Sequence, residues 1–146
     1  MSFSIDVNIL LYASDSNSQY YENAKFFLKE CIQKEELFCL GWTTVMGYLR
    51  IATHPSIFAN PLTPNEAATN IETLLNLPHT RFIAEEEGFW DIYQKLNAEI
   101  PARGNFVPDI HLAAVLKQHG VKKIYTNDRD FLKFPFLKVI NPLENL

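Results

Sequence analysis

Short apolar segments of strand character alternate along this chain with longer segments of helical periodicity. Strands are expected at residues 3–5, 37–40, 81–83, 123–125 and 138–140, and helices at 9–13, 20–34, 43–53, 64–77, 85–100 and 108–119. Within 20–34, for example, apolar residues recur at the three-to-four spacing of a helix. Strands that alternate with helices pair in parallel and are covered by helices on both faces. The expected class is therefore α/β, with three layers in the order α/β/α and a parallel sheet of short strands as the middle layer.

Local signals predict where several helices begin. Thr63, Pro64 and Glu66 have the pattern of a capping box with proline at the first helical position. The three acids at 85–87 are expected in the first turn of the helix 85–100, where they would complement its macrodipole. Most members of a group of aromatic residues are expected in the core: Phe26, Phe27, Trp90, Tyr93, Phe131, Phe134 and Phe136.

The length of 146 residues fits one domain, 1–146, and the composition of 47% hydrophobic and 21% charged residues is typical of a globular protein. No apolar run approaches the roughly 20 residues that span a bilayer. The first residues lack the pattern of a signal peptide. Cys31 and Cys39 form neither a disulfide framework nor a metal-binding motif. We therefore expect a cytoplasmic protein without a membrane contact.

The net charge of −4 and the pI of about 5.5 argue against a protein that coats nucleic acid through its bulk charge. They do not argue against a nuclease, because a bound metal offsets the negative charge of catalytic acids. Five basic residues are candidates for a local rim that holds phosphates, with ordinary surface charge as the alternative for each: Arg50, Arg81, Arg103, Arg129 and Lys133.

Three carboxylates stand where a strand ends or a helix begins. Asp6 follows the first expected strand, Asp109 opens the helix 108–119, and Asp128 follows the strand 123–125. Ligands of an open α/β sheet bind outside the carboxyl ends of its strands, so the chain order allows these acids to converge. Oxygen-only clusters suit Mg²⁺ or Mn²⁺, which indicates a metal-dependent hydrolase acting on phosphodiesters. For each acid the alternative is a helix cap or a turn residue.

Several motifs in family order give the chain its resemblance to a known family. They are DVNIL at 6–10, WTTV at 42–45 with LRIATHP at 49–55, NFVPDIHLAA at 105–114, TNDRDF at 126–131 and VINPL at 139–143. With these motifs the chain resembles the PIN-domain ribonucleases, and within them the VapC-type toxins of bacterial toxin–antitoxin pairs. The resemblance implies an α/β/α fold, a divalent metal and endonucleolytic cleavage of RNA. It also implies a cognate antitoxin and a homodimer.

The resemblance also implies roles for individual residues. Asp6, Asp109 and Asp128 fall on the metal-binding acids of the family, and Asp130 falls on a further acid near the site. Two polar residues, Asn8 and Thr126, match polar residues of the family that support the metal site. Outside these matches, Arg50 is a candidate for an RNA contact or for an ion pair with the acids, and a surface helix charge is the alternative.

The chain departs from the family on the third helix, where Gly47 stands at the position of a glutamate that many members carry. One well-held metal is therefore expected, with a weak second ion at most. The departure also leaves open a catalytically weakened PIN-fold module that binds RNA or protein, although the retained acids oppose this interpretation. A phosphatase or receiver domain is a third class, but Asn8 stands where an Asp-x-Asp phosphatase needs a second acid.

Overall fold

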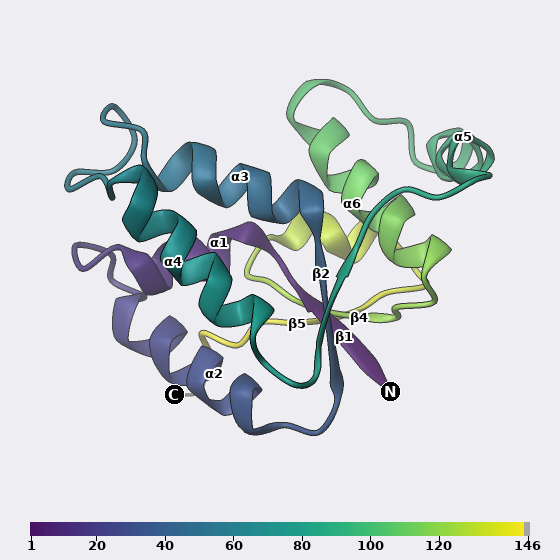
Figure 1. Cartoon of the computed structure of the whole chain (residues 1–146). Coiled ribbons are helices and arrows are strands. Elements are labelled where there is room, and N and C mark those ends of the chain that lie inside the picture. Colours follow the sequence, from purple (N-terminus) through teal and green to yellow (C-terminus); the bar gives the residue numbers. More distant parts are fainter. Residues whose placement is uncertain (145–146) are drawn as a thin grey trace.

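A parallel sheet of five strands forms the centre of the computed structural model, which describes residues 1–144 (Figure 1). The strands are β1 (Ser2–Ile5), β2 (Leu37–Gly41), β3 (Thr80–Ile83), β4 (Lys123–Tyr125) and β5 (Lys138–Ile140). Their order in the sheet is β3-β2-β1-β4-β5, and every neighbouring pair is parallel. The chain leaves β1 toward β2 on one side and reaches β4 on the other, so the strand order reverses at β1. In sheets of this kind, that reversal is where ligands bind.

Helices cover both faces of the sheet. They are α1 (Val7–Ser14), α2 (Tyr21–Gln33), α3 (Trp42–Ala52), α4 (Pro64–Leu75), α5 (Phe89–Glu99) and α6 (Val107–Gln118), with two 3₁₀ helices, η1 (Gly104–Phe106) and η2 (Arg129–Lys133). Successive residues of a strand point to opposite faces. In β2, Phe38 and Leu40 accordingly enter one hydrophobic core with α1 to α4, and Cys39 enters the other with α5 and α6. The predicted α/β/α layering is confirmed.

The helix α6 is apolar on nearly all sides, which is typical of a helix enclosed by its neighbours. Ile110 and the residues 112–116 are all buried. At its start the helix carries Asp109, so the polar end of a buried helix is brought to the sheet edge. No helix within residues 1–144 is both long and apolar enough to cross a membrane.

Most expected elements agree with the structure to within a few residues. The capping box at α4 is confirmed by two hydrogen bonds: the Thr63 amide donates to Glu66 Oε1 at 2.9 Å, and the Glu66 amide donates to Thr63 Oγ1 at 3.1 Å. The expected domain 1–146 includes residues 145 and 146, which lie outside the described part of the chain.

The predicted helix start at residue 85 is wrong, because α5 begins at Phe89 after Gly88, whose φ is +86°. The acids at 85–87 therefore precede the helix. They bridge to α6 instead: Glu85 contacts His111, and the Gln118 amide group donates to the backbone carbonyls of Glu86 and Glu87. These tertiary contacts hold the segment outside the helix, and the local sequence does not indicate them.

The predicted burial of the aromatic residues is wrong at two positions. The side chain of Phe26 is 51% exposed and that of Trp90 is 62% exposed. Phe26 precedes the buried Phe27 on α2, and adjacent helix residues point about 100° apart, so only one of the two can face the sheet. Trp90 instead stacks on Tyr93 along the outside of α5, with ring centroids 5.5 Å apart.

Candidate functional site

At the carboxyl ends of the paired strands β1 and β4, Asp6 lies beside the segment that follows β4. Ile5 lies opposite Tyr125 in the parallel register, and the Asp6 amide donates to the Tyr125 carbonyl at 3.0 Å. Asp6 is also the N-cap of α1, where Oδ1 accepts a hydrogen bond from the Val7 amide at 2.8 Å. The strand and the helix together therefore fix the position of this acid.

Thr126 joins two of the acids through one hydroxyl group. Its Oγ1 donates to Asp6 Oδ2 at 2.8 Å and accepts from the Asp128 amide at 2.9 Å. Asp6 and Thr126 are both buried. Burial raises the pKa of Asp6 to about 6, and the nearby charge of Asp128 adds to this effect, while the hydrogen bonds from Thr126 and Val7 oppose it.

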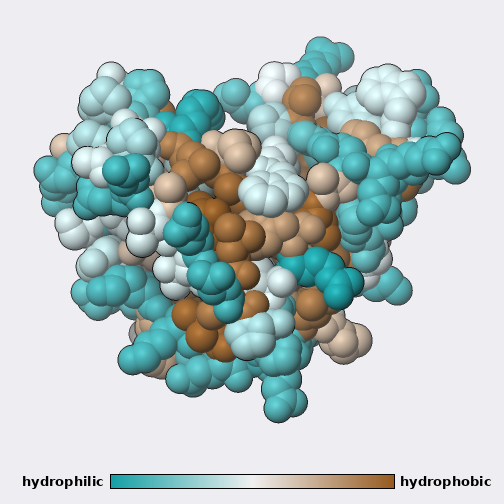
Figure 2. Space-filling model, in the orientation of Figure 1, coloured by the Kyte–Doolittle hydropathy of each residue, from teal (hydrophilic) through white to brown (hydrophobic). Residues whose placement is uncertain are grey.

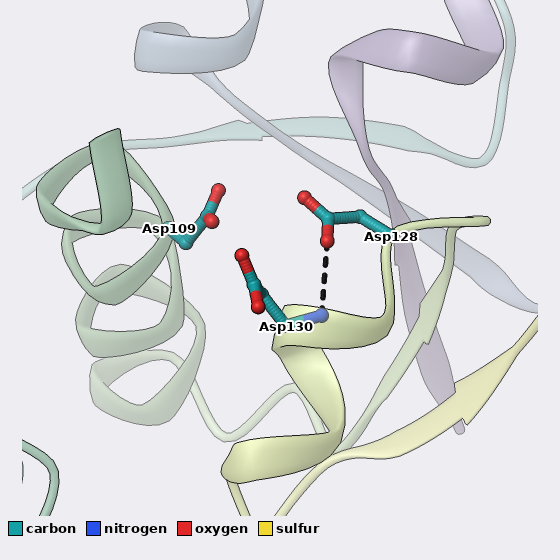
Figure 3. A group of neighbouring side chains, drawn as sticks. All are labelled: Asp109, Asp128 and Asp130. Carbon is teal, nitrogen blue, oxygen red and sulfur yellow. Dashed lines mark hydrogen bonds between the residues drawn. The ribbon is translucent and has the colours of Figure 1, made fainter.

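Asp109, Asp128 and Asp130 bring carboxylate oxygens within 4.8 Å of one another (Figure 3). They come from three segments: the start of α6, the loop after β4, and η2. Figure 3 shows the three carboxylates turned toward a shared space, with Asp128 Oδ1 accepting from the Asp130 amide at 2.9 Å. All three side chains are half-buried, so this space is open to a ligand.

The electrostatics of this group favour a bound cation. Burial and then the charges of Asp128, Asp6 and Asp130 raise the pKa of Asp109 to about 7, while Lys133 lowers it. Close carboxylates disfavour each other's ionised forms, and a cation among them relieves that repulsion. An all-oxygen set of donors suits a hard divalent ion. The residues present thus fit the metal that the sequence predicts.

Three of the four acids predicted from the sequence form one cluster, and the fourth lies beside it. The structure brings Asp109, Asp128 and Asp130 together, whereas both carboxylate oxygens of Asp6 already accept hydrogen bonds. Asp6 is linked to this group through Thr126 and through its charge, which raises the pKa of Asp109. Asp6 therefore lies beside the cluster as a buried, oriented acid.

The remaining predicted residues lie at the margin of the site. Asn8 is half-buried in the first turn of α1, and its side chain makes no hydrogen bond to another residue of 1–144. Arg50 is exposed in the last turn of α3, with no ion pair to any described acid. A Cβ atom at Gly47 would lie 3.8 Å from Val7 Cγ2, an ordinary contact. Position 47 thus faces the first residue of α1, and glycine leaves space there.

Two contacts at the site lie beyond what sequence reasoning identified. The Asn127 side-chain amide donates to the Tyr12 hydroxyl at 3.1 Å, which ties the residue before Asp128 to α1. Lys133 Nζ lies 3.4 Å from Asp130 Oδ1. The ion pair of Lys133 with Asp130 could have been predicted from its i,i+3 spacing. The hydrogen bond of Asn127 with Tyr12 could not, because the two residues are 115 positions apart in the sequence.

Comparison with known proteins establishes the family of this chain. The PIN domain family matches residues 4–137. Ribonuclease VapC48 of Mycobacterium tuberculosis is 37% identical over 142 residues, covering 97% of this chain and 98% of that protein. VapC ribonuclease Mb2897 of Mycobacterium bovis is 26% identical over 140 residues, covering 96% of this chain and 95% of that protein. The chain therefore belongs to the PIN-domain family, and these relatives are VapC ribonucleases.

Solved structures share the fold at low sequence identity. The crystal structure of Mycobacterium tuberculosis VapC20, described as a sarcin-ricin loop cleaving toxin, matches with a TM-score of 0.69 at 13% identity, over 95% of this chain and 99% of that one. The structure of VapBC2 from Rickettsia felis, bound to a DNA fragment from its promoter, matches with a TM-score of 0.68 at 16% identity. The match covers 97% of this chain and 98% of that one. At these identities the likeness establishes the fold.

The raised pKa values predict how pH and metal affect stability. Asp6 and Asp109 titrate in the folded protein near 6 and 7, above their ordinary value of 3.8. The stability they contribute is therefore fully present below about pH 4 and is lost as the pH rises through 6 and 7. Without metal, the thermal midpoint of Asp109→Asn should fall less between about pH 5 and about pH 8 than that of the wild type.

Mg²⁺ should raise the wild-type midpoint more at about pH 8 than at about pH 5, because protonated carboxyls do not bind the ion. Calorimetric scans at both pH values measure the midpoints. Asp91→Asn is the control, since Asp91 is an exposed acid on α5 outside the cluster. Equal Mg²⁺ effects at the two pH values, or identical pH profiles for Asp109→Asn and Asp91→Asn, would contradict the assignment.

Proposed function

We propose that this protein is a metal-dependent endoribonuclease that acts as the toxin of a toxin–antitoxin pair. The observation that carries the proposal is the group of oxygen donors at the point where the sheet order reverses, within a PIN-family chain. Related proteins of matching length are named ribonucleases. The two free, buried cysteines, Cys31 and Cys39, are in keeping with the reducing cytosol, where such a protein would act.

In this proposal the metal is Mg²⁺ or Mn²⁺, held by Asp6, Asp109 and Asp128 with Asp130 beside them. When bound, such an ion polarises the phosphate and activates water. Asp6 is held in one orientation by hydrogen bonds to both of its oxygens. Because the Thr126 hydroxyl also accepts from the Asp128 amide, one side chain sets the relative positions of two ligands.

Metal binding at Asp109 should also be coupled to the release of a proton. Its pKa of about 7 means that a substantial fraction is protonated in the metal-free protein near neutral pH. The Asp109 carboxyl would release this proton when its oxygens hold a cation, because a metal competes with protons for the same oxygen. Affinity for the ion should accordingly rise with pH across this range.

The alternative of a weakened binding module rests on Gly47 alone. The space next to Val7 has no carboxylate at position 47, so one potential metal ligand is missing. Against this, all four acids of the predicted site are present, and three of them already lie within 4.8 Å of each other. We therefore favour a catalytic site that depends on one ion.

An apolar groove supports the proposal of an antitoxin partner. It has a volume of about 420 Å³ and lies between α1, α2, α3 and α4. Its apolar lining includes Leu10, Leu28, Ile32 and Leu74. Such a groove suits the apolar face of a partner helix. Solved structures with this fold include toxin–antitoxin complexes, among them one from Klebsiella pneumoniae with a TM-score of 0.60.

A separate apolar face supports the proposal of a homodimer. Figure 2 shows apolar residues gathered over the middle of one side of the molecule, where α4, β3 and the start of α3 lie. Trp42, Met46 and Leu75 are each 40% exposed or more, and the Trp42 ring packs on Phe82 at 4.8 Å. Exposed apolar patches of this kind mark interaction surfaces, and we assign this one to a second copy of the chain.

Asp109→Asn should reduce Mg²⁺-dependent RNA cleavage by more than about 100-fold with little change in fold, because the amide cannot replace a charged metal ligand. Gel assays of RNA cleavage with Mg²⁺ and with EDTA measure the activity, and circular dichroism checks the fold. Asp91→Asn is the matched control and should retain wild-type activity. Wild-type activity in Asp109→Asn, or cleavage that survives EDTA, would exclude the metal-site assignment.

Ile32→Glu should weaken antitoxin binding by about tenfold or more, because it places an unpaired charge in the apolar groove. Phe26→Glu is the control: Phe26 is on the same helix and is 51% exposed, against 45% for Ile32, but it does not line the groove. The measurement is co-purification of a partner with the tagged protein, expressed from its native genomic locus. Equal recovery of the partner with both variants would count against the groove.

A homodimer should have twice the chain mass of 16.8 kDa. Light scattering of the purified protein measures this mass, and Met46→Lys, which charges the apolar face, should shift the protein toward the monomer. Leu132→Lys is the control, since Leu132 is as exposed as Met46, at 56%, but lies on η2. A monomeric wild type at concentrations of about 10 µM would rule out a stable dimer.

A further inference from the structure

Lys133 places a positive charge at the edge of the acid cluster. It is the last residue of η2, and its Nζ lies 3.4 Å from Asp130 Oδ1. Within residues 1–144, it is the only basic side chain that forms an ion pair with one of the four site acids. Its charge also acts on the centre of the group, because it opposes the rise in the pKa of Asp109.

An aromatic ring also contacts this ammonium group. Lys133 Nζ lies 4.6 Å from the centroid of Phe106, a distance at which a cation is attracted to the ring face. Phe106 is itself anchored, because it stacks on the buried Phe134 with centroids 5.6 Å apart and planes 7° from parallel. Phe106 ends η1 directly before α6, so Lys133, which shares η2 with Asp130, contacts the segment that leads into the helix of Asp109.

Stability alone does not account for this arrangement. The side chains of Lys133 and Asp130 are 55% and 49% exposed, and exposed ion pairs contribute little to folding. Function gives a stronger reason, because four acids at one sheet edge repel an RNA backbone. A divalent ion neutralises only part of that charge. A lysine on the same rim offers a point charge for a phosphate oxygen.

We propose that Lys133 is the phosphate-binding residue of this site, and that its ammonium group contacts an RNA phosphate oxygen beside the acid cluster. The inference rests on the proposed ribonuclease function and adds a residue to it. Lys133 determines affinity for RNA in this account, whereas the acids determine affinity for metal. Because Lys133 repels a divalent ion and shares Asp130 with it, removing the lysine leaves metal binding unchanged or tighter.

The test compares RNA binding with metal binding in the same variants. Lys133→Gln removes the charge and Lys133→Arg keeps it. Lys117→Gln is the matched control, because Lys117 Nζ also lies over a ring, 5.2 Å from the Phe136 centroid, but at the far end of α6 from Asp109. The RNA probe is a fluorescein-labelled single strand of about 12 nucleotides in EDTA, followed by anisotropy at several salt concentrations. Calorimetric titration with Mn²⁺ measures metal affinity without RNA.

Lys133→Gln should bind the probe about three- to tenfold more weakly, with a salt dependence shallower by about 0.7 in slope, the value for one phosphate contact on a single strand. Lys133→Arg and Lys117→Gln should bind like the wild type, and Mn²⁺ affinity should not fall in Lys133→Gln. A wild type that binds RNA no better than Lys133→Gln would overturn the inference. So would a parallel loss of RNA and Mn²⁺ binding, which indicates a structural role. Failure of the wild type to cleave RNA with Mg²⁺ would instead contradict the proposed function.

Discussion

Repulsion among carboxylates held at one edge of the sheet is the constraint on which the rest of the structure depends. Burial, with the charges of neighbouring carboxylates added to it, raises the pKa values of both Asp6 and Asp109, so the fold holds these acids together at a cost to their ionised forms. Rigid elements make this possible. The β1–β4 pair fixes Asp6 next to Thr126, and the enclosed helix α6 fixes Asp109. A scaffold that prevents the acids from separating prepares them for a cation.

Much of the fold and the location of the site could be predicted from the sequence. The alternation of strands and helices determines the layers, and Asp6 and Asp128 are recognisable as acids at strand ends. The contacts between these elements could not be predicted. The Thr126 hydroxyl reaches Asp6 across 120 residues of sequence, and only the register of β1 with β4 brings the two together. The acids at 85–87 failed as a helix start for the same reason, because their partners lie on α6.

The helix α1 connects the acid site to the apolar groove. Asp6 caps its N-terminus, and its residue Leu10 lines the groove. It also contacts the segment before Asp128 through Tyr12 and Asn127. A partner seated in the groove would therefore touch the same helix that orients a site acid. The apolar face with Trp42 and Met46 lies on α3, which packs against α1.

We propose above that the acids at the β1–β4 junction hold a divalent ion. The most direct measurement is anomalous diffraction from crystals soaked in Mn²⁺, which locates the ion without reference to activity. We expect one strong peak within about 2.5 Å of carboxylate oxygens of Asp109 and Asp128, with Asp6 or Asp130 next to it. No peak among these acids at saturating Mn²⁺, or a peak only at other acids, would contradict it.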